Sequence, residues 1–464
     1  MAQIKRLRLG EIAGALGGRL NRADCSGREI SGVCIDTRYI TGGELFIPLK
    51  GNTDGHAFIG SAFEKGAACA LSERDVMPDK PVIRVDSTSG AMLRLAEYCA
   101  ARFKIPKIAI TGSSGKTTTK DMTADVLSQR YNTLRTIGNH NNEIGVPLTV
   151  FALDAGHECA VFEMGMNHSG ELERLSRVVR PDICVITNIG VAHIENFGSR
   201  EGILRAKLEM LEHMRPGGTT ILNGSDDMLS TVIGSVENPM LYWIENEAPR
   251  IPDTAGGVYA TDVTDNGMDG VSCAIHYGGS AFRVNLRTPG RHMIFNALAA
   301  AAVGFCMGLT AEQIKSGIEG YVPGDARMNT LKAQNGITII DDSYNANPIS
   351  MKSALDVLSK APGRRICVLG DMLELGSYSD EMHFCIGQYA AAKGLDTAIF
   401  IGEKSEYAYD AYVAARPEGN ALHFARRESL YDCLGKVVKA GDVVLVKASH
   451  GMRFSEVVEK IKQI

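Results

Sequence analysis

The chain has no apolar run long enough to cross a membrane. Its longest, near residues 297–309, is about thirteen residues, whereas a spanning helix needs roughly twenty. Residues 1–6 also carry no apolar segment of the kind found in secretory signals, so the sequence predicts a cytoplasmic protein without integral membrane association. The 11 cysteines are scattered singly, with no C-x-x-C pair. That spacing indicates reduced thiols and not a disulfide framework.

Charge of one sign is also missing as a block. The 49 basic and 54 acidic residues leave a net charge of −5, so bulk electrostatics favours neither nucleic acid nor an anionic membrane. Any anionic ligand must therefore be held by local charges. The sequence contains no G-x-G-x-x-G after a strand and no internal repeat, which disfavours a dinucleotide cofactor and a repeat architecture.

A glycine-pinched loop is present at residues 109–120, AITGSSGKTTTK, between an apolar strand and a helix. Backbone N–H groups in such a loop point at anionic oxygens, a lysine adds positive charge, and a threonine hydroxyl can ligate Mg²⁺. The G-x-x-G-K-T spacing is shorter than the commonest form, but a turn that merely caps a helix rarely needs Lys-Thr. The predicted ligand is ATP. The predicted phosphate-binding residues are Gly112, Ser113, Ser114, Gly115, Lys116, Thr117 and Thr118.

Three successive patterns predict three domains and an α/β fold. Residues 1–103 combine short strands and turns with a helix over 89–103, which indicates a small α/β domain. Residues 104–322 alternate apolar strands and helices, which predicts a P-loop-type ATPase with a mainly parallel sheet. Residues 323–464 repeat that alternation after a linker near 321–324 and predict a Rossmann-like domain. The strands are expected at 108–111, 159–163, 183–187, 220–222, 337–341, 366–369, 398–401 and 443–446, and helices at 291–307 and 311–317.

Three residues of the central region could carry chemistry. Glu163 ends a strand, where a carboxylate reaches the rim of a parallel sheet, although a structural glutamate is an equal alternative. His193 follows the next strand, and an isolated loop histidine is more often hydrogen-bonded or solvated. Lys207, taken alone, indicates a solvated helix lysine.

Several motifs, in order along nearly the whole chain, together resemble the Mur ligase family. They are the phosphate loop, GNHNNEIGVP at 138–147, EMGM at 163–166, TNIGVAH at 187–193 and DDSYNANP at 341–348. Two N-terminal segments, DTR at 36–38 and GNTDGH at 51–56, are similar to the family's uridine-nucleotide segment. The resemblance implies that the N-terminal domain binds a UDP-linked substrate through Asp36, Thr37, Arg38, Asp54, Gly55 and His56.

The resemblance implies an ATP-dependent amide ligation in the branch of the family that adds a dipeptide. The carboxylate of UDP-N-acetylmuramoyl-tripeptide would attack the γ-phosphorus of ATP and form an acyl phosphate. The amine of D-alanyl-D-alanine would attack that carbonyl, and phosphate would leave, giving the pentapeptide precursor of peptidoglycan. Because phosphoryl transfer mainly needs alignment and charge neutralisation, the residues described above agree with this chemistry.

The same resemblance assigns the metal ligands. Thr117 and Glu163 would hold one Mg²⁺ and His193 a second. Lys207 matches the family's carbamylated lysine, in which CO₂ turns an ammonium into a carboxylate-like ligand for the second ion. The expected catalytic residues are Lys116, Glu163, His193, Lys207 and Arg327.

Further residues match family positions around ATP and the dipeptide. Asn296 would lie near adenine, with a helix-entry asparagine as the alternative, and Arg327 would approach the ATP phosphates. Asp341 or Asp342 would face the ribose; for these residues and Arg327, surface ion pairing is the alternative. Asn345 and Asn347 would shape the dipeptide site, but the adjacent proline makes helix capping a competitor.

Two other functions compete with this interpretation. A sister ligase that adds the third peptide residue is disfavoured because the chain has no D-N-P-R sequence. A non-catalytic module, in which ATP merely sets a conformation, could retain the same motifs. The expected protein is a monomer with no nucleic-acid partner, and the sequence leaves open whether the third peptide residue is lysine or diaminopimelate.

Overall fold

The computed structural model describes residues 7–247, 256–333 and 335–464. Residues 1–6, which entered the expectation that there is no signal segment, lie outside this part. The described residues form an α/β protein with three mainly parallel sheets of five, nine and six strands, so the predicted fold class is confirmed. In the described ranges, no helix combines the length and apolarity that crossing a bilayer requires. All 11 cysteines are free, as their spacing predicts.

Packing divides the chain into two compact units, which are described separately. The first comprises Met1–Thr111, Arg130–Val185 and Ala206–Thr220 in their described parts. The second comprises Gly112–Gln129, Ile186–Arg205 and Ile221–Ile464, again in their described parts. The three domain boundaries expected from the sequence remain a prediction.

The N-terminal sheet has the strand order β1-β5-β4-β3-β2. Strand β1 pairs antiparallel with β5, and the remaining neighbours pair in parallel. Its strands are β1 (Arg19–Leu20), β2 (Val33–Cys34), β3 (Leu45–Phe46), β4 (Cys69–Ser72) and β5 (Val82–Arg84), and its helices are α1 (Leu9–Leu16), α2 (Ile59–Glu64) and α3 (Thr88–Ala101). The α3 helix begins where Ser87 accepts a hydrogen bond from the N–H of Gly90, as an N-cap does.

The central sheet has the order β14-β13-β12-β11-β10-β9-β6-β8-β7. Its first strands are β6 (Lys107–Thr111), β7 (Thr133–Arg135), β8 (Cys159–Glu163), β9 (Ile183–Ile186) and β10 (Thr219–Asn223). Strands β6, β8 and β9 are buried throughout, which explains their continuous apolar sequences. Both β7 and β8 lie on one side of β6 and β9 on the other, so the strand order reverses beside β6. Ligands of open α/β sheets bind at the carboxyl ends of strands at such a reversal.

Helices connect these central strands. They are α4 (Lys116–Leu127), α5 (Gly145–Phe151), α6 (Glu171–Val179), α7 (Ile194–Phe197) and α8 (Arg200–Leu208). The helix after β6, α4, follows the glycine loop directly, so the phosphate loop predicted from the sequence lies at the carboxyl end of β6.

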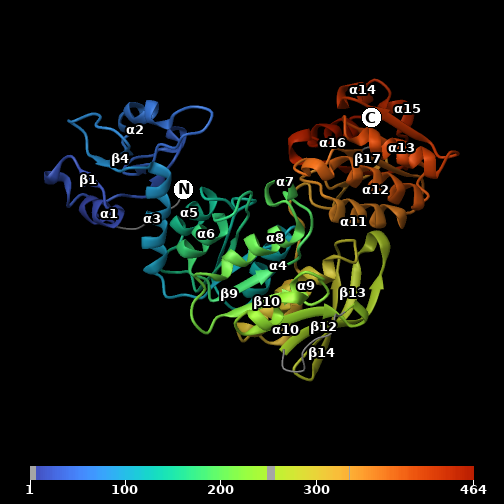
Figure 1. Cartoon of the computed structure of the whole chain (residues 1–464), viewed down its shortest axis with the longest axis horizontal. Helices are drawn as coiled ribbons and strands as arrows, with labels where there is room; N and C mark the ends of the chain where they lie inside the picture. Colours follow the sequence, from blue (N-terminus) through green and yellow to red (C-terminus); the bar gives the residue numbers. More distant parts are fainter. Residues whose placement is uncertain (1–6, 248–255, 334) are drawn as a thin grey trace. The chain divides into compact units, whose positions relative to one another are not determined.

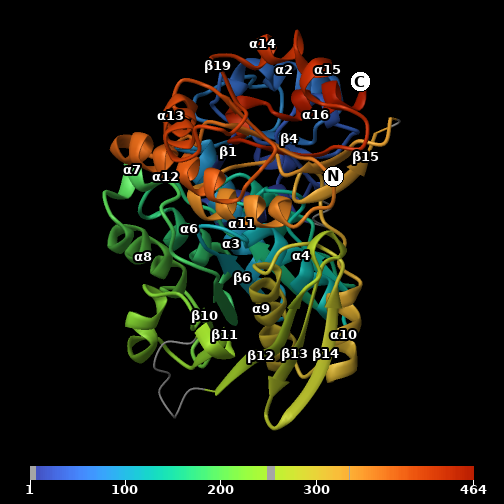
Figure 2. The same cartoon turned by 90° about the vertical axis from the view of Figure 1, so that its right-hand side faces the viewer.

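The far end of the central sheet is an extension packed against two helices. It contains β11 (Pro239–Ile244), β12 (Gly256–Asp265), β13 (Val271–Tyr277) and β14 (Ser280–Leu286), followed by α9 (Met293–Cys306) and α10 (Ala311–Glu319). Strands β12, β13 and β14 pair antiparallel, and α9 and α10 lie against this part of the sheet (Figures 1 and 2). At the edge strand β14, the backbone N–H of Asn285 donates to Oε1 of Glu319 on α10 at 2.9 Å.

The C-terminal sheet has the order β15-β16-β20-β17-β18-β19, in which only the β15–β16 pair is antiparallel. Its strands are β15 (Asn329–Lys332), β16 (Thr338–Asp341), β17 (Arg365–Gly370), β18 (Thr397–Ile401), β19 (Ala421–Phe424) and β20 (Val443–Lys447). Its helices are α11 (Pro348–Ser359), α12 (Ser379–Ala392), α13 (Ser405–Ala415), α14 (Arg427–Tyr431), α15 (Leu434–Val437) and α16 (Ser455–Lys462). Figure 1 shows these helices around the sheet, in orange and red. The sheet core of isoleucines and valines packs against Val457, Val458 and Ile461 of α16.

Candidate active site

The glycine loop depends on two glycines that other residues cannot replace without strain. Gly112 has φ +151°, and a Cβ there would lie 1.8 Å from Oγ1 of Thr187. Gly115 has φ +78° and forms the N-cap of α4. The N-cap residue Gly115 has no side chain that could cap the first turn of α4, so the N–H groups of that turn retain the orientation that attracts phosphate.

The segment after β9 braces this loop. Ser113 donates its backbone N–H to the carbonyl of Asn188, and its hydroxyl accepts the N–H of Gly190 at 2.9 Å. Ser114 donates its N–H to Oδ1 of Asn188, and its carbonyl accepts from the Thr187 hydroxyl at 2.6 Å. The loop therefore has a fixed shape before any ligand binds.

Lys116 begins α4, and its Nζ donates to the carbonyl of Gly112 at 2.8 Å. The amine of Lys116 is thus held against the glycine loop, where it is predicted to bind phosphate. Thr117 is 6% exposed, and Thr118 follows it in the first turn of α4. All seven predicted phosphate-loop residues lie in one continuous turn at the carboxyl end of β6 and the start of α4.

Glu163 is almost fully buried, with 1% of its surface exposed, at the end of β8. Its Oε1 accepts a hydrogen bond from Nδ2 of Asn141 at 2.7 Å, and its backbone N–H donates to the hydroxyl of Thr136. Among the described residues, its Oε2 has no hydrogen-bond partner. Because a buried carboxylate oxygen without a partner is costly, this atom fits a bound cation.

Lys207 lies in α8 with only 3% of its surface exposed. This burial excludes the interpretation of Lys207 as a solvated helix lysine. The lysine belongs to the first compact unit together with Glu163.

His193 immediately precedes α7 and has the left-handed φ of +60°. Its Nδ1 lies 2.7 Å from Oε2 of Glu374, although the ring N–H is not well aligned for a hydrogen bond to any described residue. The interaction with His193 lowers the pKa of Glu374 below its ordinary value, against the opposing effect of burial. The structure therefore gives His193 a charged partner that the sequence analysis did not identify.

Asn296 lies in α9 and faces the phosphate-loop helix. Its Oδ1 accepts from the hydroxyl of Thr119 at 3.1 Å, and a Cβ on Gly115 would lie 2.8 Å from the same oxygen. Its Nδ2 contacts the sulfur of Met293 at 3.6 Å. These contacts place Asn296 beside the phosphate loop, and the predicted role near adenine remains a prediction.

Arg327 and Asp342 belong to one local arrangement in the C-terminal part. The Arg327 guanidinium carbon lies 3.9 Å from the centre of the Tyr344 ring, a cation–π geometry. Asp342 accepts the N–H of Met328 and forms an ion pair with Lys447, which also donates to the carbonyl of Asn345. Asp342 is therefore part of a buried ion pair that fixes the segment carrying Arg327.

The other residues expected near the ribose and dipeptide have local partners. Asp341 is 8% exposed and accepts the N–H and hydroxyl of Ser343; burial raises the pKa of Asp341 above its ordinary value. Asn347 is the N-cap of α11 and accepts the N–H of Ser350 at 2.9 Å, with Pro348 at the first helical position. The side chain of Asn347 is engaged in capping, the competitor named above, while Asn345 is exposed.

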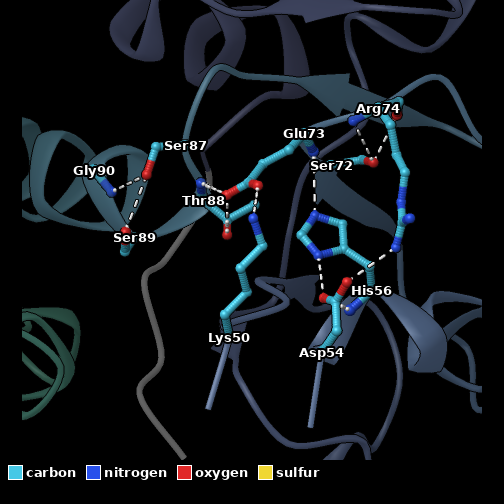
Figure 3. A network of polar contacts seen from close by, with 10 residues as sticks. All are labelled: Lys50, Asp54, His56, Ser72, Glu73, Arg74, Ser87, Thr88, Ser89 and Gly90. Carbon is cyan, nitrogen blue, oxygen red and sulfur yellow. Dashed lines mark hydrogen bonds and ion pairs between the residues drawn. The ribbon is translucent and has the colours of Figure 1, made fainter.

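His56, in the short helix Gly55–Phe58, lies at the centre of a polar network in the N-terminal part of the chain (Figure 3). Its side chain is 2% exposed; Nε2 accepts the N–H of Glu73 at 3.2 Å, and Nδ1 lies 2.7 Å from Asp54 Oδ1. Because Nε2 accepts, the proton must be on Nδ1 and is donated to Asp54. Arg74 binds the second oxygen of Asp54, and Lys50 pairs with Glu73. The buried His56 therefore connects the segments that carry Asp54 and Glu73, while Asp54 and Lys50 remain more exposed.

The remaining N-terminal candidates form a separate turn. Asp36 caps this turn and pairs with the exposed guanidinium of Arg38, while the carbonyl of Thr37 accepts from Lys65. Gly55 adjoins the network of His56, and a Cβ there would lie 2.6 Å from the carbonyl oxygen of Leu49.

Three residues with clear roles in this geometry were not singled out from the sequence. Asn141 and Asn188 lie inside quoted motifs, yet only the structure shows that they bind Glu163 and the glycine loop. Glu374 follows β17 in the stretch GDMLELG. A carboxylate just beyond the carboxyl end of a parallel strand was the signal that could have identified it.

Comparisons with known proteins cover the same regions. The Mur ligase family, catalytic domain, matches residues 29–107; the Mur ligase middle domain matches 110–304; and the Mur ligase, glutamate ligase domain, matches 326–450. The UDP-N-acetylmuramoyl-tripeptide–D-alanyl-D-alanine ligases of Bacillus subtilis and Escherichia coli are each 35% identical to the chain, with alignments covering 93% and 98% of both partners, respectively.

Two solved structures similar to this chain belong to the same group of ligases. A crystal structure of MurF from Acinetobacter baumannii is 29% identical over 100% of both chains, with a TM-score of 0.91. MurF ligase from Thermotoga maritima in complex with ADP is 27% identical over 93% of this chain and 97% of that one, with a TM-score of 0.81.

The fold and the phosphate loop define an ATP-dependent, ADP-forming ligase, and the chain belongs to the Mur ligase family. Within that family, the relatives described above, which match it over nearly its full length, are the enzymes called MurF.

Proposed function

We propose that this protein uses ATP to join D-alanyl-D-alanine to UDP-N-acetylmuramoyl-tripeptide through an acyl phosphate, giving the pentapeptide precursor of peptidoglycan. The observation that carries the proposal is the braced phosphate loop at the reversal point of the central sheet, in a chain that matches the Escherichia coli ligase over 98% of its length. Because one substrate is a nucleotide-linked tripeptide and the other is a free dipeptide, the reaction takes place in the cytoplasm. The protein acts as a monomer with the three domains 1–103, 104–322 and 323–464.

The proposed metal ligands are Thr117, Glu163, His193 and Lys207, for two Mg²⁺ ions. When bound, the ions neutralise the charge that builds up between ATP and the attacking carboxylate. The Oε2 of Glu163, which has no hydrogen-bond partner among the described residues, supports this assignment, because a cation would supply the interaction that this buried oxygen lacks.

Lys207 is proposed to be carbamylated. Its amine would add to the carbon of CO₂ and release a proton, so that an ammonium becomes an anionic oxygen ligand. The burial of Lys207 supports this, since a buried ammonium close to a bound cation would be opposed by both desolvation and repulsion.

The chain's other residues act by binding and alignment. Lys116 and the loop N–H groups hold the phosphates, and Arg327 approaches them from the C-terminal part. Asn296, beside the phosphate loop, lies near adenine, and Asp341 or Asp342 faces the ribose. Closure of the C-terminal domain over ATP excludes water from the acyl phosphate. The dipeptide is contacted near Asn345 and Asn347, and the uridine nucleotide near Asp36, Thr37, Arg38, Asp54, Gly55 and His56.

Phosphate release tests the proposal directly. Wild-type protein with ATP and Mg²⁺ is expected to release phosphate only when both the muramoyl tripeptide and D-alanyl-D-alanine are present, with pentapeptide detected by mass. Product formed with a free third-position amino acid and a dipeptide acceptor would instead identify the sister ligase. Binding of ATP and both substrates without amide formation would identify a non-catalytic module.

A lysine variant links the assay to the site. Lys116→Ala is expected to lose about 100-fold or more in kcat, because it removes a charge that stabilises the transition state. Lys436→Ala, at an exposed position of α15, is the matched control and is expected to retain wild-type activity. Equal activity of Lys116→Ala and wild type would contradict the assignment of the loop.

A further inference from the structure

A loop of the C-terminal part reaches the histidine that follows β9. Glu374 lies between β17 and α12, and its Oε2 is 2.7 Å from Nδ1 of His193. The two residues are 181 positions apart in sequence and belong to the same compact unit. The contact therefore connects the central sheet's rim to the C-terminal sheet's rim.

Both partners have a backbone conformation that non-glycine residues rarely adopt. The φ angle is +60° at His193 and +65° at Glu374. Each such residue costs on the order of 1–2 kcal/mol, so surrounding contacts must hold it in place. Residues held in such conformations cluster at active sites, ligand clamps and switch regions.

The loop that carries Glu374 is anchored on the residues just before it. Asp371 accepts the N–H and the hydroxyl of Ser405, both at 2.7 Å. Met372 donates its N–H to Nε2 of the buried His383 at 2.9 Å. Leu373 donates its N–H to a serine hydroxyl after β20 at 2.8 Å. Three consecutive residues are thus fixed, and the position of Glu374 follows from them.

The same loop packs against α7 on the other side of Glu374. The short helix Gly376–Tyr378 contacts α7, and α12 begins directly after it. Tyr378 donates its hydroxyl to the carbonyl of Gly198 at 3.4 Å. Gly376 has φ +53°, and a Cβ there would lie 2.8 Å from the Cβ of Glu195. A glycine is needed for this close approach.

We propose that Glu374 is a positioning residue for His193. Its Oε2 lies 2.7 Å from Nδ1, close enough to accept the Nδ1 proton after a small rotation of the ring, which would leave the Nε2 lone pair free to bind Mg²⁺ and fix the ring orientation. Histidines that bind metals usually donate their second ring N–H to a carboxylate or carbonyl in this way. This inference rests on the proposed function, in which His193 is a metal ligand.

The arrangement has a structural consequence. Glu374 is carried by the loop after β17, whereas His193 is carried by the segment after β9. His193 is therefore oriented for the metal only while these two parts of the chain are docked. Assembly of the second metal position becomes coupled to the position of the C-terminal sheet.

Metal binding to the full-length chain tests this role without relying on activity. Mn²⁺ binding is measured by electron paramagnetic resonance in the presence of the β,γ-methylene analogue of ATP. We expect Glu374→Ala to weaken Mn²⁺ binding by about 10- to 100-fold, the usual effect of removing a partner of a metal ligand. Glu374→Gln is expected to stay within about threefold of wild type, because its amide oxygen still accepts the Nδ1 proton.

The matched control is Asp380→Ala. Asp380 is the second residue of α12 and pairs with Lys404 inside the C-terminal part, so it is an acidic residue six positions from Glu374 without the contact to His193. Its Mn²⁺ affinity is expected to equal that of wild type. Binding of the ATP analogue without metal is expected to be unchanged in all three variants.

Nitrogen NMR of ¹⁵N-histidine-labelled protein gives a second readout. The His193 signal, assigned by its loss in His193→Gln, is expected to show a proton on Nδ1 in wild type and in Glu374→Gln, and a mixture of tautomers in Glu374→Ala.

Wild-type Mn²⁺ affinity in Glu374→Ala would overturn the inference. Equal losses in Glu374→Gln and Glu374→Ala would also overturn it, because Glu374 would then act by charge as a direct ligand. The proposed function can fail separately: it fails if wild type binds Mn²⁺ and nucleotide yet never forms the pentapeptide.

Discussion

Asn141 offers a sharp test of the buried carboxylate. Its Nδ2 donates to Oε1 of Glu163 at 2.7 Å, and a Cβ on Gly165 would lie within 2.9 Å of the Asn141 side chain, so the amide has little freedom to turn away. The substitution Asn141→Ala removes this donor. It leaves a second oxygen of a carboxylate that is 1% exposed without its partner.

The size of the effect follows from the type of bond. A hydrogen bond to a charged group contributes about 1.5–3 kcal/mol, which corresponds to roughly 10- to 150-fold in an equilibrium constant. Loss of a partner of a metal ligand weakens metal binding by about 10- to 100-fold. We therefore expect the Mg²⁺ concentration for half-maximal phosphate release to rise by about 10- to 100-fold in Asn141→Ala, at saturating ATP, tripeptide and dipeptide.

Asn142→Ala is the matched control. The neighbouring amide of Asn142 accepts the N–H groups of Ile144 and Gly145 at the start of α5, so its loss perturbs the same loop without removing the bond to Glu163. An unchanged Mg²⁺ requirement in Asn141→Ala would refute the reasoning. Equal shifts in both variants would assign the effect to the loop as a whole.

Three further outcomes are expected. Gly112→Ala should weaken ATP binding, measured by calorimetry, more than Gly115→Ala does. The new Cβ would lie 1.8 Å from Oγ1 of Thr187 at position 112, but 2.8 Å from Oδ1 of Asn296 at position 115. The reverse order of the two affinities would contradict the loop geometry. Burial lowers the pKa of His383 below its ordinary value of about 6.5, so below that pH the unfolded chain binds more protons than the folded one. The midpoint of thermal unfolding should therefore fall as pH drops from about 7.5 to about 5.5. His383→Gln should flatten this dependence, and parallel curves would argue against it. Lys207→Ala should lose ligase activity and regain part of it with added short carboxylic acids; a folded variant that no acid rescues would weaken the carbamate proposal.

The buried strands were the easiest elements to predict from the sequence. The predicted strand at 159–163 coincides with β8, and β9 is one residue shorter than expected. Both are buried at every position, so their apolar runs leave little ambiguity. Helix α9 was also expected, with its ends displaced by one or two residues.

The antiparallel extension of the central sheet was not predicted. Strands β13 and β14 are joined by Gly278 and Gly279, both with positive φ, which is a recognisable hairpin signal. The strands themselves alternate between buried and exposed positions less regularly than a clear amphipathic pattern requires. Local periodicity therefore gave a weak indication where the turn gave a strong one.

The candidate site was predictable in its parts but not in its contacts. The glycine loop follows from spacing, because its chemistry is local. The contacts of Asn188 with Ser114 and of Glu374 with His193 join segments separated by 74 and 181 residues. Periodicity and composition carry no information about such partners. Asn347 shows a second limit of sequence-based prediction: its position before Pro348 was compatible with both a ligand contact and a helix cap, and the structure shows the cap.

The carboxylate of Glu319 has a consequence for how this protein behaves at high concentration. The edge strand β14 of the nine-stranded sheet presents backbone donors that another chain could use to continue the sheet. Because Glu319 already occupies the N–H of Asn285, an incoming strand would have to displace a charged acceptor and bring its own carbonyl close to it. A single side chain from a neighbouring helix thereby discourages the addition of a strand at the β14 edge.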